Sequence, residues 1–407
     1  MFSYEKAIDH QRRKTMNKLR IAVIGAGPRA NDYMATIKKL DDKYDFCALA
    51  DKNLERANAS AQKYGVHPIY TDVEKMLKEE KPDVFFALTP TDSLSVMAIM
   101  SAENKVNVIR EIPIGITRQV AEAVEKACID NGVKHEIAEN VWVWPHERLK
   151  RKIVEAGLLG KILHVRLWYT SGAYHGFNAV RMLLGSEAKR VLGYVGKVEV
   201  PTYTNYGGEL DNTRFWESAI IEFENDVTCL FGKPLPGPRS SLWEVEGTEG
   251  YLSGSELVLF KDNLHFPFRD IYEEIDGKRV LDHVRIDTDP PIIWSNPFKK
   301  YGISDTDEVA KATILCSMHS AITENKDLIY GAKNALKDLE LCVAVFESGI
   351  NGNKWIELPI QYETEVEKRI HKEFIRKYGY DPIKDADKLK NTIFTRASVI
   401  WKVAGWL

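Results

Sequence analysis

The residues with the clearest chemical meaning form a glycine turn near the start of the chain. Gly25, Gly27 and Ala30 give a GxGxxA pattern in VIGAGPRA, between an apolar run and a segment of helical period. In that setting the first glycine permits a tight turn, the second lets backbone approach a pyrophosphate, and the small third residue lets helix and strand pack closely. The helix N-terminus would face the phosphates, and Pro28 suits its first turn. The pattern predicts a dinucleotide site; the alternative is a turn that only packs a helix on a sheet.

An acid closes the next apolar run. Asp51 ends DFCALAD, where a carboxylate can accept hydrogen bonds from ribose hydroxyls and repel a 2′-phosphate. This position favours NAD. Lys52 and Arg56 are basic neighbours, and they leave NADP as the alternative.

Two charges close another apolar run, in VNVIREIPIGIT, residues 106–117. Arg110 and Glu111 end the run, and Pro113 and Gly115 then turn the chain. Ligands of doubly wound sheets bind at the carboxyl ends of the strands, so we expect Glu111 to be an acid of the cofactor site. The alternative is that Glu111 is the ion-pair partner of a nearby base.

Positioning these residues requires a regular alternation of strands and helices. Short apolar, β-branched runs predict strands, and segments of period 3.6 between them predict helices. The strands are expected within 19–27, 45–51, 83–90, 106–112 and 133–140, and the helices within 28–40, 54–65, 72–81, 93–105 and 117–132. The pattern predicts an α/β fold whose first domain, residues 19–140, is a doubly wound parallel sheet of the Rossmann type.

After residue 140 the alternation of strand and helix patterns ends. A helix is expected from Pro145 to Gly160, and period-2 segments follow between Gly, Asn and Asp turns. They predict a second α/β domain, residues 141–360, built on a large, open, mostly antiparallel sheet. Helices are expected at 308–323 and 331–349, and a last strand at 354–360. Residues 1–18 are expected to be a polar arm and residues 361–407 a helical C-terminal extension.

Composition limits the class of partner. The chain has 407 residues, with 56 Lys and Arg against 59 Asp and Glu, so no strong field attracts nucleic acid or an anionic membrane. The five cysteines are scattered without metal or disulfide spacing, and we expect no metal site. No secretory apolar region and no membrane-spanning run is found, so we expect a cytoplasmic protein.

Several segments in chain order carry a family resemblance: VIGAGPRA, ALAD, FALTPTDSLSV, VNVIREIPIG, ENVWVWP, GLLGKI and HGFNAVRMLLG. Together they resemble the family of glucose-fructose oxidoreductase, inositol dehydrogenase and MocA over roughly residues 19–360. The resemblance implies hydride transfer between a nicotinamide and the CHOH or C=O carbon of a sugar, sugar acid or cyclitol. It also implies a homodimer or homotetramer assembled through the C-terminal sheet.

The chain departs from the family at its reacting centre. The family commonly has Glu-Lys-Pro at the strand end, and here Glu111 and Pro113 are kept while Ile112 replaces the lysine. Isoleucine neither donates nor accepts a proton. Arg110 is a poor replacement, because it lies one strand repeat back and arginine hardly ever deprotonates.

A second family motif aligns His175 with the family histidine, while Ser171 and Asn178 stand where aspartates are frequent. We expect His175 to be the acid/base, because its ordinary pKa of about 6.5 suits proton exchange near neutrality. Tyr174, or Tyr169 on the preceding strand, would donate to a carbonyl oxygen, and Asn178 would orient the substrate without titrating.

The resemblance also implies further cofactor contacts, from Arg29, Thr89, Pro90, Pro113 and Asn140. Thr91 and Leu94 stand at positions where the family frequently has Asn and His.

Among other candidates, the basic segment 146–152 predicts a solvated helix face. Five tryptophans are candidates for stacking on a sugar ring, with core packing as the alternative: Trp142, Trp144, Trp168, Trp216 and Trp243.

Three functions therefore remain as alternatives. The first is an NAD(P)-dependent oxidoreductase with His175, Tyr174, Asn178 and Glu111 in its catalytic pocket. The second is a glycoside-cleaving or lyase-type enzyme that recycles bound NAD. The third is a dinucleotide-binding regulatory protein without turnover, which the replaced lysine and aspartate would favour.

Overall fold

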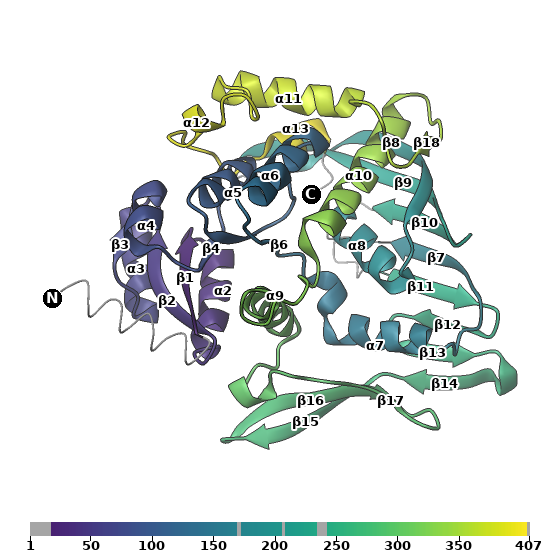
Figure 1. The fold of residues 1–407 in the computed structure, drawn as a ribbon. Helices are drawn as coiled ribbons and strands as arrows, with labels where there is room; N and C mark the ends of the chain where they lie inside the picture. Colours follow the sequence, from purple (N-terminus) through teal and green to yellow (C-terminus); the bar gives the residue numbers. More distant parts are fainter. Residues whose placement is uncertain (1–17, 169–171, 206–207, 234–241, 405–407) are drawn as a thin grey trace.

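The computed structural model describes residues 18–168, 172–205, 208–233 and 242–404. Nearly all of the expected N-terminal arm, together with Tyr169 and Ser171, lies outside the described residues. Figure 1 shows a small sheet at the left and a larger one at the right, with helix α10 (Gly331–Ile350) between them. The structure confirms the expected α/β class.

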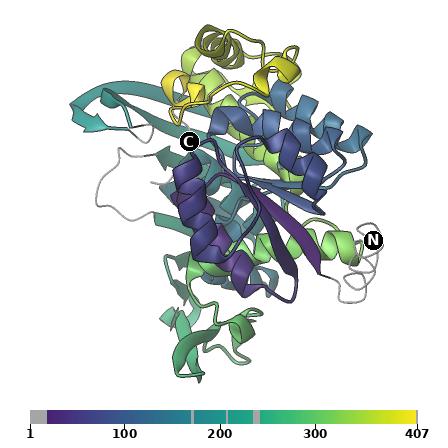
Figure 2. The ribbon, with the colours of Figure 1, turned by 90° about the vertical axis from the view of Figure 1, so that its left-hand side faces the viewer.

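The first sheet is six-stranded and parallel, in the order β3-β2-β1-β4-β5-β6. Strands β1 and β4 are almost completely buried, because helices cover both faces of the sheet. Figure 2 turns this half of the molecule toward the reader. Its strands are β1 (Leu19–Ile24), β2 (Tyr44–Ala50), β3 (Ile69–Tyr70), β4 (Val84–Ala87), β5 (Asn107–Arg110) and β6 (His135–Ile137). Its helices are α2 (Pro28–Lys39), α3 (Leu54–Tyr64), α4 (Val73–Glu80), α5 (Leu94–Glu103) and α6 (Arg118–Asp130).

One helix from the second half of the chain also packs on this sheet. Helix α9 (Thr306–Thr323) lies against α2, and the Tyr44 hydroxyl donates to the Leu315 carbonyl at 2.7 Å. Asp305 caps the helix by accepting hydrogen bonds from the backbone N–H groups of Asp307 and Glu308. The start of α9 is thereby placed beside the carboxyl edge of the Rossmann sheet.

The second sheet has nine strands in the order β14-β13-β12-β11-β7-β10-β9-β8-β18. Only the β7–β10 pair is parallel, so the expectation of a mostly antiparallel sheet is confirmed. Its strands are β7 (Ile162–Trp168), β8 (Ala188–Thr204), β9 (Leu210–Phe223), β10 (Thr228–Lys233), β11 (Leu242–Gly247), β12 (Gly250–Ser253), β13 (Glu256–Leu259), β14 (Leu264–Pro267) and β18 (Ile356–Glu357). Helices α8 (Ala173–Leu184) and α10 cover one face.

A third, three-stranded sheet was not among the expected elements. It consists of β15 (Arg269–Ile275), β16 (Lys278–Ile286) and β17 (Ile292–Ser295), and lies at the bottom of Figure 1. Asp276 and Gly277, both at positive φ, form the hairpin turn between β15 and β16. An Asp-Gly pair between alternating segments is a strong hairpin signal, so the sequence did contain the evidence for it.

The expected solvated face of α7 (Pro145–Glu155) is present at Lys152, which is exposed, but not at Lys150 and Arg148. Lys150 is buried, with its ammonium 4.4 Å from the Trp243 ring centroid and 2.8 Å from Glu147. Arg148 stacks on Trp142 at 4.6 Å, and burial lowers the pKa of Arg148 to about 10. The aromatic rings take the place of solvent, since long basic side chains can bury their stems against them.

The C-terminal part of the chain contains three helices and packs onto the Rossmann half. Helices α11 (Glu365–Tyr378), α12 (Ala386–Leu389) and α13 (Val399–Val403) lie above α5 and α6 in Figure 1. Arg118 at the start of α6 pairs with Glu367 of α11 at 2.7 Å, and both side chains are buried. Among the described residues, no helix is long and apolar enough to cross a membrane.

Candidate active site

The glycine turn has the geometry that a pyrophosphate needs. Gly25 has φ +102°, and a Cβ there would lie 2.2 Å from the Leu88 carbonyl oxygen. A Cβ on Gly27 would meet nothing within 4 Å, so space is open before α2. No side chain caps the N-terminus of α2, while Pro28 begins the helix and Ala30 is buried. The uncapped N–H groups beside open space fit a bound phosphate, so this turn fits a dinucleotide.

Asp51 lies at the end of β2, beside the glycine turn. Its carboxylate accepts hydrogen bonds from the N–H groups of Ala26 and Asn53, each at 2.7 Å. Arg56 donates to it from Nη2 at 2.8 Å and from Nε at 3.2 Å. The Arg56 side chain is 53% exposed, whereas the Asp51 side chain is only 3% exposed.

Glu111 belongs to an ion-pair network at the carboxyl edge of the sheet. Arg29 donates to Glu111 at 2.8 Å and to Asp307, at the start of α9, at 2.9 Å. Asn140 also donates to Asp307. Arg29 thus links Glu111 to Asp307, and Asp307 links Arg29 to Asn140. The sequence did not single out Asp307.

Arg110 has a different role from its neighbour. It is fully buried and donates to the carbonyl oxygens of Glu111 and Pro113, so it holds the turn that carries Glu111. Burial lowers the pKa of Arg110 to about 10, and its Nη1 has no hydrogen-bond partner within the described structure. The two charges at the strand end thus separate into a buried support, Arg110, and a carboxylate that pairs with Arg29, which is the ion-pair alternative for Glu111.

His175, on α8, is paired with a buried carboxylate. Its Nδ1 lies 2.8 Å from Oε2 and 3.0 Å from Oε1 of Glu139, a fully buried residue that follows β6. Burial of the imidazole lowers the pKa of His175, but attraction and hydrogen bonding to Glu139 outweigh it, so the net shift is upward. Glu111 adds to that upward shift and Arg29 opposes it, which places His175 in the field of the ion-pair network.

Sequence reasoning missed Glu139. The only signal was its position beside Asn140 at the end of a predicted strand, where ligands of such folds bind. Nothing in the local pattern couples it to a residue on α8.

Tyr174 and Asn178 contact α10 rather than Glu139, although the charge of Glu139 adds to burial in raising the pKa of Tyr174. The Tyr174 side chain is fully buried, with its hydroxyl 3.1 Å from that of Tyr330 and 3.2 Å from the Ala335 carbonyl. Asn178, also fully buried, donates to Asp338 at 3.0 Å. Both expected catalytic side chains are turned toward α10, which leaves them no path to a substrate in this structure.

The remaining motif residues line the turns after β4 and β5. Thr89 accepts a hydrogen bond from Ser93 at 2.8 Å, and the Pro90 carbonyl accepts another at 2.7 Å. Ile112, at the family's lysine position, is half-buried against the core, and the Ile112–Pro113 peptide is cis.

The tryptophans are divided between the core and an open sheet face. Trp142 and Trp243 are buried and Trp144 is half-buried, whereas Trp168 and Trp216 are exposed on the nine-stranded sheet. Core packing, the alternative reading, therefore fits the first three.

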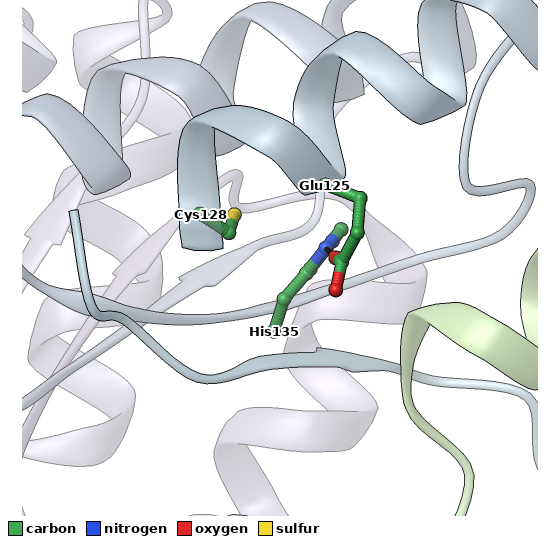
Figure 3. A group of neighbouring side chains, drawn as sticks. All are labelled: Glu125, Cys128 and His135. Carbon is green, nitrogen blue, oxygen red and sulfur yellow. Dashed lines mark hydrogen bonds and ion pairs between the residues drawn. The ribbon is translucent and has the colours of Figure 1, made fainter. Parts of the chain in front are cut away.

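A second polar cluster lies behind the sheet edge. Glu125 and Cys128 extend from α6 toward His135 on β6, and their ligand atoms all lie within 4.8 Å of one another (Figure 3). Burial raises the pKa of the Cys128 thiol to about 12, so the thiol is protonated at neutral pH. Burial lowers the pKa of His135, the hydrogen bond and charge of Glu125 oppose that shift, and the positive charge of Arg110 adds to it. The same positive charge opposes a metal cation there.

Comparison with known proteins also identifies the N-terminal part of the chain as a dinucleotide-binding domain. Residues 19–138 match the model of an oxidoreductase family with an NAD-binding Rossmann fold. The chain is 32% identical to D-glucoside 3-dehydrogenase of Escherichia coli over 107 residues, 26% of this chain and 30% of that protein. It is 27% identical to trans-1,2-dihydrobenzene-1,2-diol dehydrogenase of Mus musculus, over 66% of this chain and 87% of the mouse protein. The chain spans less than two fifths of the length of the first of these relatives.

The fold match extends beyond that region. A solved structure of levoglucosan dehydrogenase with NADH and levoglucosan covers 84% of this chain and all of its own, with a TM-score of 0.66 and 18% identity. An NAD-binding oxidoreductase from Klebsiella pneumoniae matches with a TM-score of 0.65 and 16% identity, and covers 84% of this chain and 99% of its own. The glycine turn, Asp51 and Glu111 fall within the matched residues 19–138, so this part of the chain is similar to the NAD-binding Rossmann domain of the oxidoreductase family of glucose-fructose oxidoreductase, inositol dehydrogenase and MocA.

Proposed function

We propose that the protein is an NAD-dependent oxidoreductase acting on a CHOH or C=O carbon of a sugar, sugar acid or cyclitol. The observation that carries this proposal is the His175–Glu139 pair beside Glu111 and Arg29. The pair lies at the carboxyl edge of the sheet that bears the glycine turn, the edge at which doubly wound folds bind their ligands. Asp51 at the end of β2 supports NAD, while Arg56, which pairs with it, keeps NADP as the alternative.

The proposed chemistry needs one proton carrier from the protein. Bound NAD supplies a hydride acceptor, and the hydroxyl proton of the substrate passes to Nε2 of His175. In this proposal His175 donates its Nδ1–H to Glu139. That hydrogen bond fixes the His175 tautomer in which Nε2 is unprotonated, and the Glu139 charge stabilises the imidazolium once it forms. In the reverse direction His175 returns the proton to the carbonyl oxygen.

The other candidates take supporting roles in this proposal. Arg29 and Asn140, joined through Asp307, hold the rim on which Glu111 lies, and Glu111 contacts cofactor or substrate. Tyr174 and Asn178 position α8 against α10, and with it His175.

The names of several relatives support the substrate class. They act, by name, on a D-glucoside, D-apiose and scyllo-inositol, which all carry ring hydroxyls on secondary carbons. The polar rim of Glu111, Arg29 and Asp307 offers both acceptors and donors to such hydroxyls.

We also propose a cytoplasmic homo-oligomer, a dimer or tetramer. The nine-stranded sheet exposes Trp168, Tyr194, Trp216 and Leu230, each more than a third accessible. Gly232 and Gly196 leave room for Trp168 and Trp216 to lie over the strands, since a Cβ at either glycine would meet those rings at 2.7 and 2.2 Å. Such an apolar aromatic patch is typical of a surface that another subunit covers.

The test is NADH formation from NAD with a panel of sugars, sugar acids and cyclitols. We expect turnover with a cyclic polyol, and a loss of at least a hundredfold in His175→Ala. The matched control is His146→Ala on α7, whose imidazole bonds only to Ser255 and Asp270 within the described structure. Turnover unaffected by His175→Ala would overturn the role of His175.

The two alternatives give different results in the same experiment. Tight NAD binding without turnover across the panel would indicate a regulatory protein. Cleavage or elimination of a glycoside with no net NADH would indicate a recycled cofactor.

A further inference from the structure

The C-terminal extension touches both sides of the proposed dinucleotide crevice. After α12, Lys390 pairs with Glu103 at the end of α5, with 2.7 Å between Nζ and Oε2. Two residues later the Thr392 carbonyl accepts a hydrogen bond from Lys52, which directly follows Asp51. The chain then reaches Asp92, in the turn after β4. One segment, residues 390–399, therefore joins the ends of two Rossmann strands.

The contact at Asp92 is a buried anchor. The carboxylate of Asp92 is fully buried and accepts from Ser398 Oγ at 2.6 Å and from the Val399 N–H at 3.2 Å. Tyr378 donates to it at 2.8 Å, and Lys377 lies 3.4 Å away. Charge-assisted hydrogen bonds of this kind are strong because the surroundings exclude water.

The contact at Lys52 is weaker. It is a single hydrogen bond from an exposed lysine to a backbone carbonyl. Exposed lysine contacts contribute little, because solvent screens the charge and the long side chain loses entropy. The segment is thus fixed at its Asp92 end and loosely held at its Lys52 end.

The sheet order locates the span between these two contacts. Strand β1, which leads into the glycine turn, lies between β2 and β4, so the ends of β2 and β4 are about 10 Å apart. Residues 392–398 are long enough to cover that distance. Dinucleotide folds place the adenosine half between the first strand's turn and the acid that ends the second strand.

An exposed apolar side chain marks the loose end of the segment. Ile393, next to Thr392, has 77% of its surface accessible. Because Ile393 follows the residue whose carbonyl accepts the Lys52 hydrogen bond, its exposed side chain is available to cover an aromatic base entering the crevice.

We infer that residues 390–399 form a strap that closes the adenosine end of the dinucleotide crevice. Its Lys52 end opens to admit or release the cofactor, while its Asp92 end stays attached. Ile393 covers the adenine face when the strap is closed. The inference rests on the proposed dinucleotide binding, and it makes slow cofactor release a property of the C-terminal extension.

The first test measures NADH dissociation from the full-length protein by stopped-flow fluorescence, with excess NAD as the competitor. Ile393→Ser and Ser398→Ala act only on the strap side, and we expect dissociation at least fivefold faster in each. Ile375→Ser on α11 is the matched control, because it removes an exposed isoleucine from the same extension, and its rate should equal the wild-type rate.

A second test needs no variant. Hydrogen exchange of residues 390–398 is followed in the wild type with ADP-ribose or with nicotinamide mononucleotide. We expect ADP-ribose, which has the adenosine half, to slow exchange at least threefold, and nicotinamide mononucleotide to leave it unchanged.

The outcomes separate the strap from the proposed function. NADH that binds, but dissociates at the wild-type rate from both strap variants, overturns the strap alone. Equal slowing of hydrogen exchange in residues 390–398 by ADP-ribose and by nicotinamide mononucleotide also overturns the strap. Absence of any NAD(H) or ADP-ribose binding by the wild type overturns the proposed function together with the strap.

Discussion

At the scale of single residues, the pairing of His175 with Glu139 leads to a specific prediction about the pH dependence of the rate. Glu139 raises the pKa of His175, and oxidation of a hydroxyl requires the unprotonated imidazole. The rate of oxidation should therefore fall as the pH drops through that raised pKa. In Glu139→Gln the pKa of His175 falls, so the acid limb of the kcat/KM profile should move to lower pH.

The pH profile separates this role from a merely structural one. A structural defect would lower kcat/KM equally at all pH values and leave the limb where it was. An unmoved acid limb in Glu139→Gln, with substrate turnover retained, would contradict the proposed pairing.

Asn178 allows a second prediction at this scale. It stands where the family often has aspartate, but here it donates to the buried Asp338, which also pairs with Arg181 at 2.7 Å. Asn178→Asp would place a second carboxylate beside Asp338, at a cost of about 2–4 kcal/mol in the free energy of unfolding at pH 8. Burial raises the pKa of the new carboxyl, so the loss should be largest above that pKa and shrink as the pH falls.

Urea unfolding at pH 5 and pH 8 checks this. Asn178→Ala is the control, because it removes one hydrogen bond without adding charge and should lose about the same stability at both pH values. Equal stability of Asn178→Asp and the wild type at pH 8 would show that Asp338 does not restrict this position.

At the scale of elements, Glu136 joins β6 to the junction of α9 and α10. This fully buried carboxylate accepts from the Ser317 hydroxyl at 2.5 Å and from the Gly331 N–H at 2.7 Å. Burial raises the pKa of Glu136 to about 7. A carboxyl whose pKa is raised on folding stabilises the folded state at low pH, and that stability is lost as the pH rises through about 4.5 to 7.

The free energy of unfolding should therefore increase by about 2–3 kcal/mol in total from this group between pH 8 and pH 5. Glu136→Gln keeps the shape and can keep both hydrogen bonds, but it removes the titration. We expect the variant to be more stable than the wild type at pH 8 and to converge toward it at pH 5. Parallel pH curves for the two proteins would refute the assignment.

The elements themselves were largely predictable from the sequence, and the reason is periodicity. Apolar runs ending in glycine or acid predicted the Rossmann strands, and period-2 segments predicted the nine-stranded sheet. The helix face that a residue occupies was not predictable to the same degree. Tyr174 and His175 are adjacent in sequence, yet one faces α10 and the other the site, because tertiary packing decides which face of α8 is covered.

The same limit applies to the site. The glycine turn, Asp51, Glu111 and His175 carry local signals, whereas Glu139 and Asp307 reach their partners across 36 and 278 residues of chain. Local patterns contain no information about such pairs. The family resemblance found the histidine but not its carboxylate.

At the scale of the whole molecule, the uncovered face of the nine-stranded sheet remains to be explained. Trp168, Tyr194, Trp216 and Leu230 are exposed on it, and the Tyr194 and Trp216 rings lie 4.9 Å apart. Removing a broad apolar face from water stabilises an interface at roughly 25 cal/mol per Å². A second copy of the chain is the proposed cover.

Leu230→Arg should therefore convert the assembly to single chains, because it places a charge in the centre of that face. Sedimentation velocity measures the result directly. Ile271→Arg is the matched control, since Ile271 is exposed on the separate three-stranded sheet, and that variant should sediment like the wild type. A wild-type protein that sediments as one chain, or a Leu230→Arg variant that keeps the wild-type mass, would exclude this face as the interface. Because the side chain of Leu230 points away from α8 and α10, the substitution should leave the NADH dissociation constant of each chain unchanged, which separates assembly from cofactor binding.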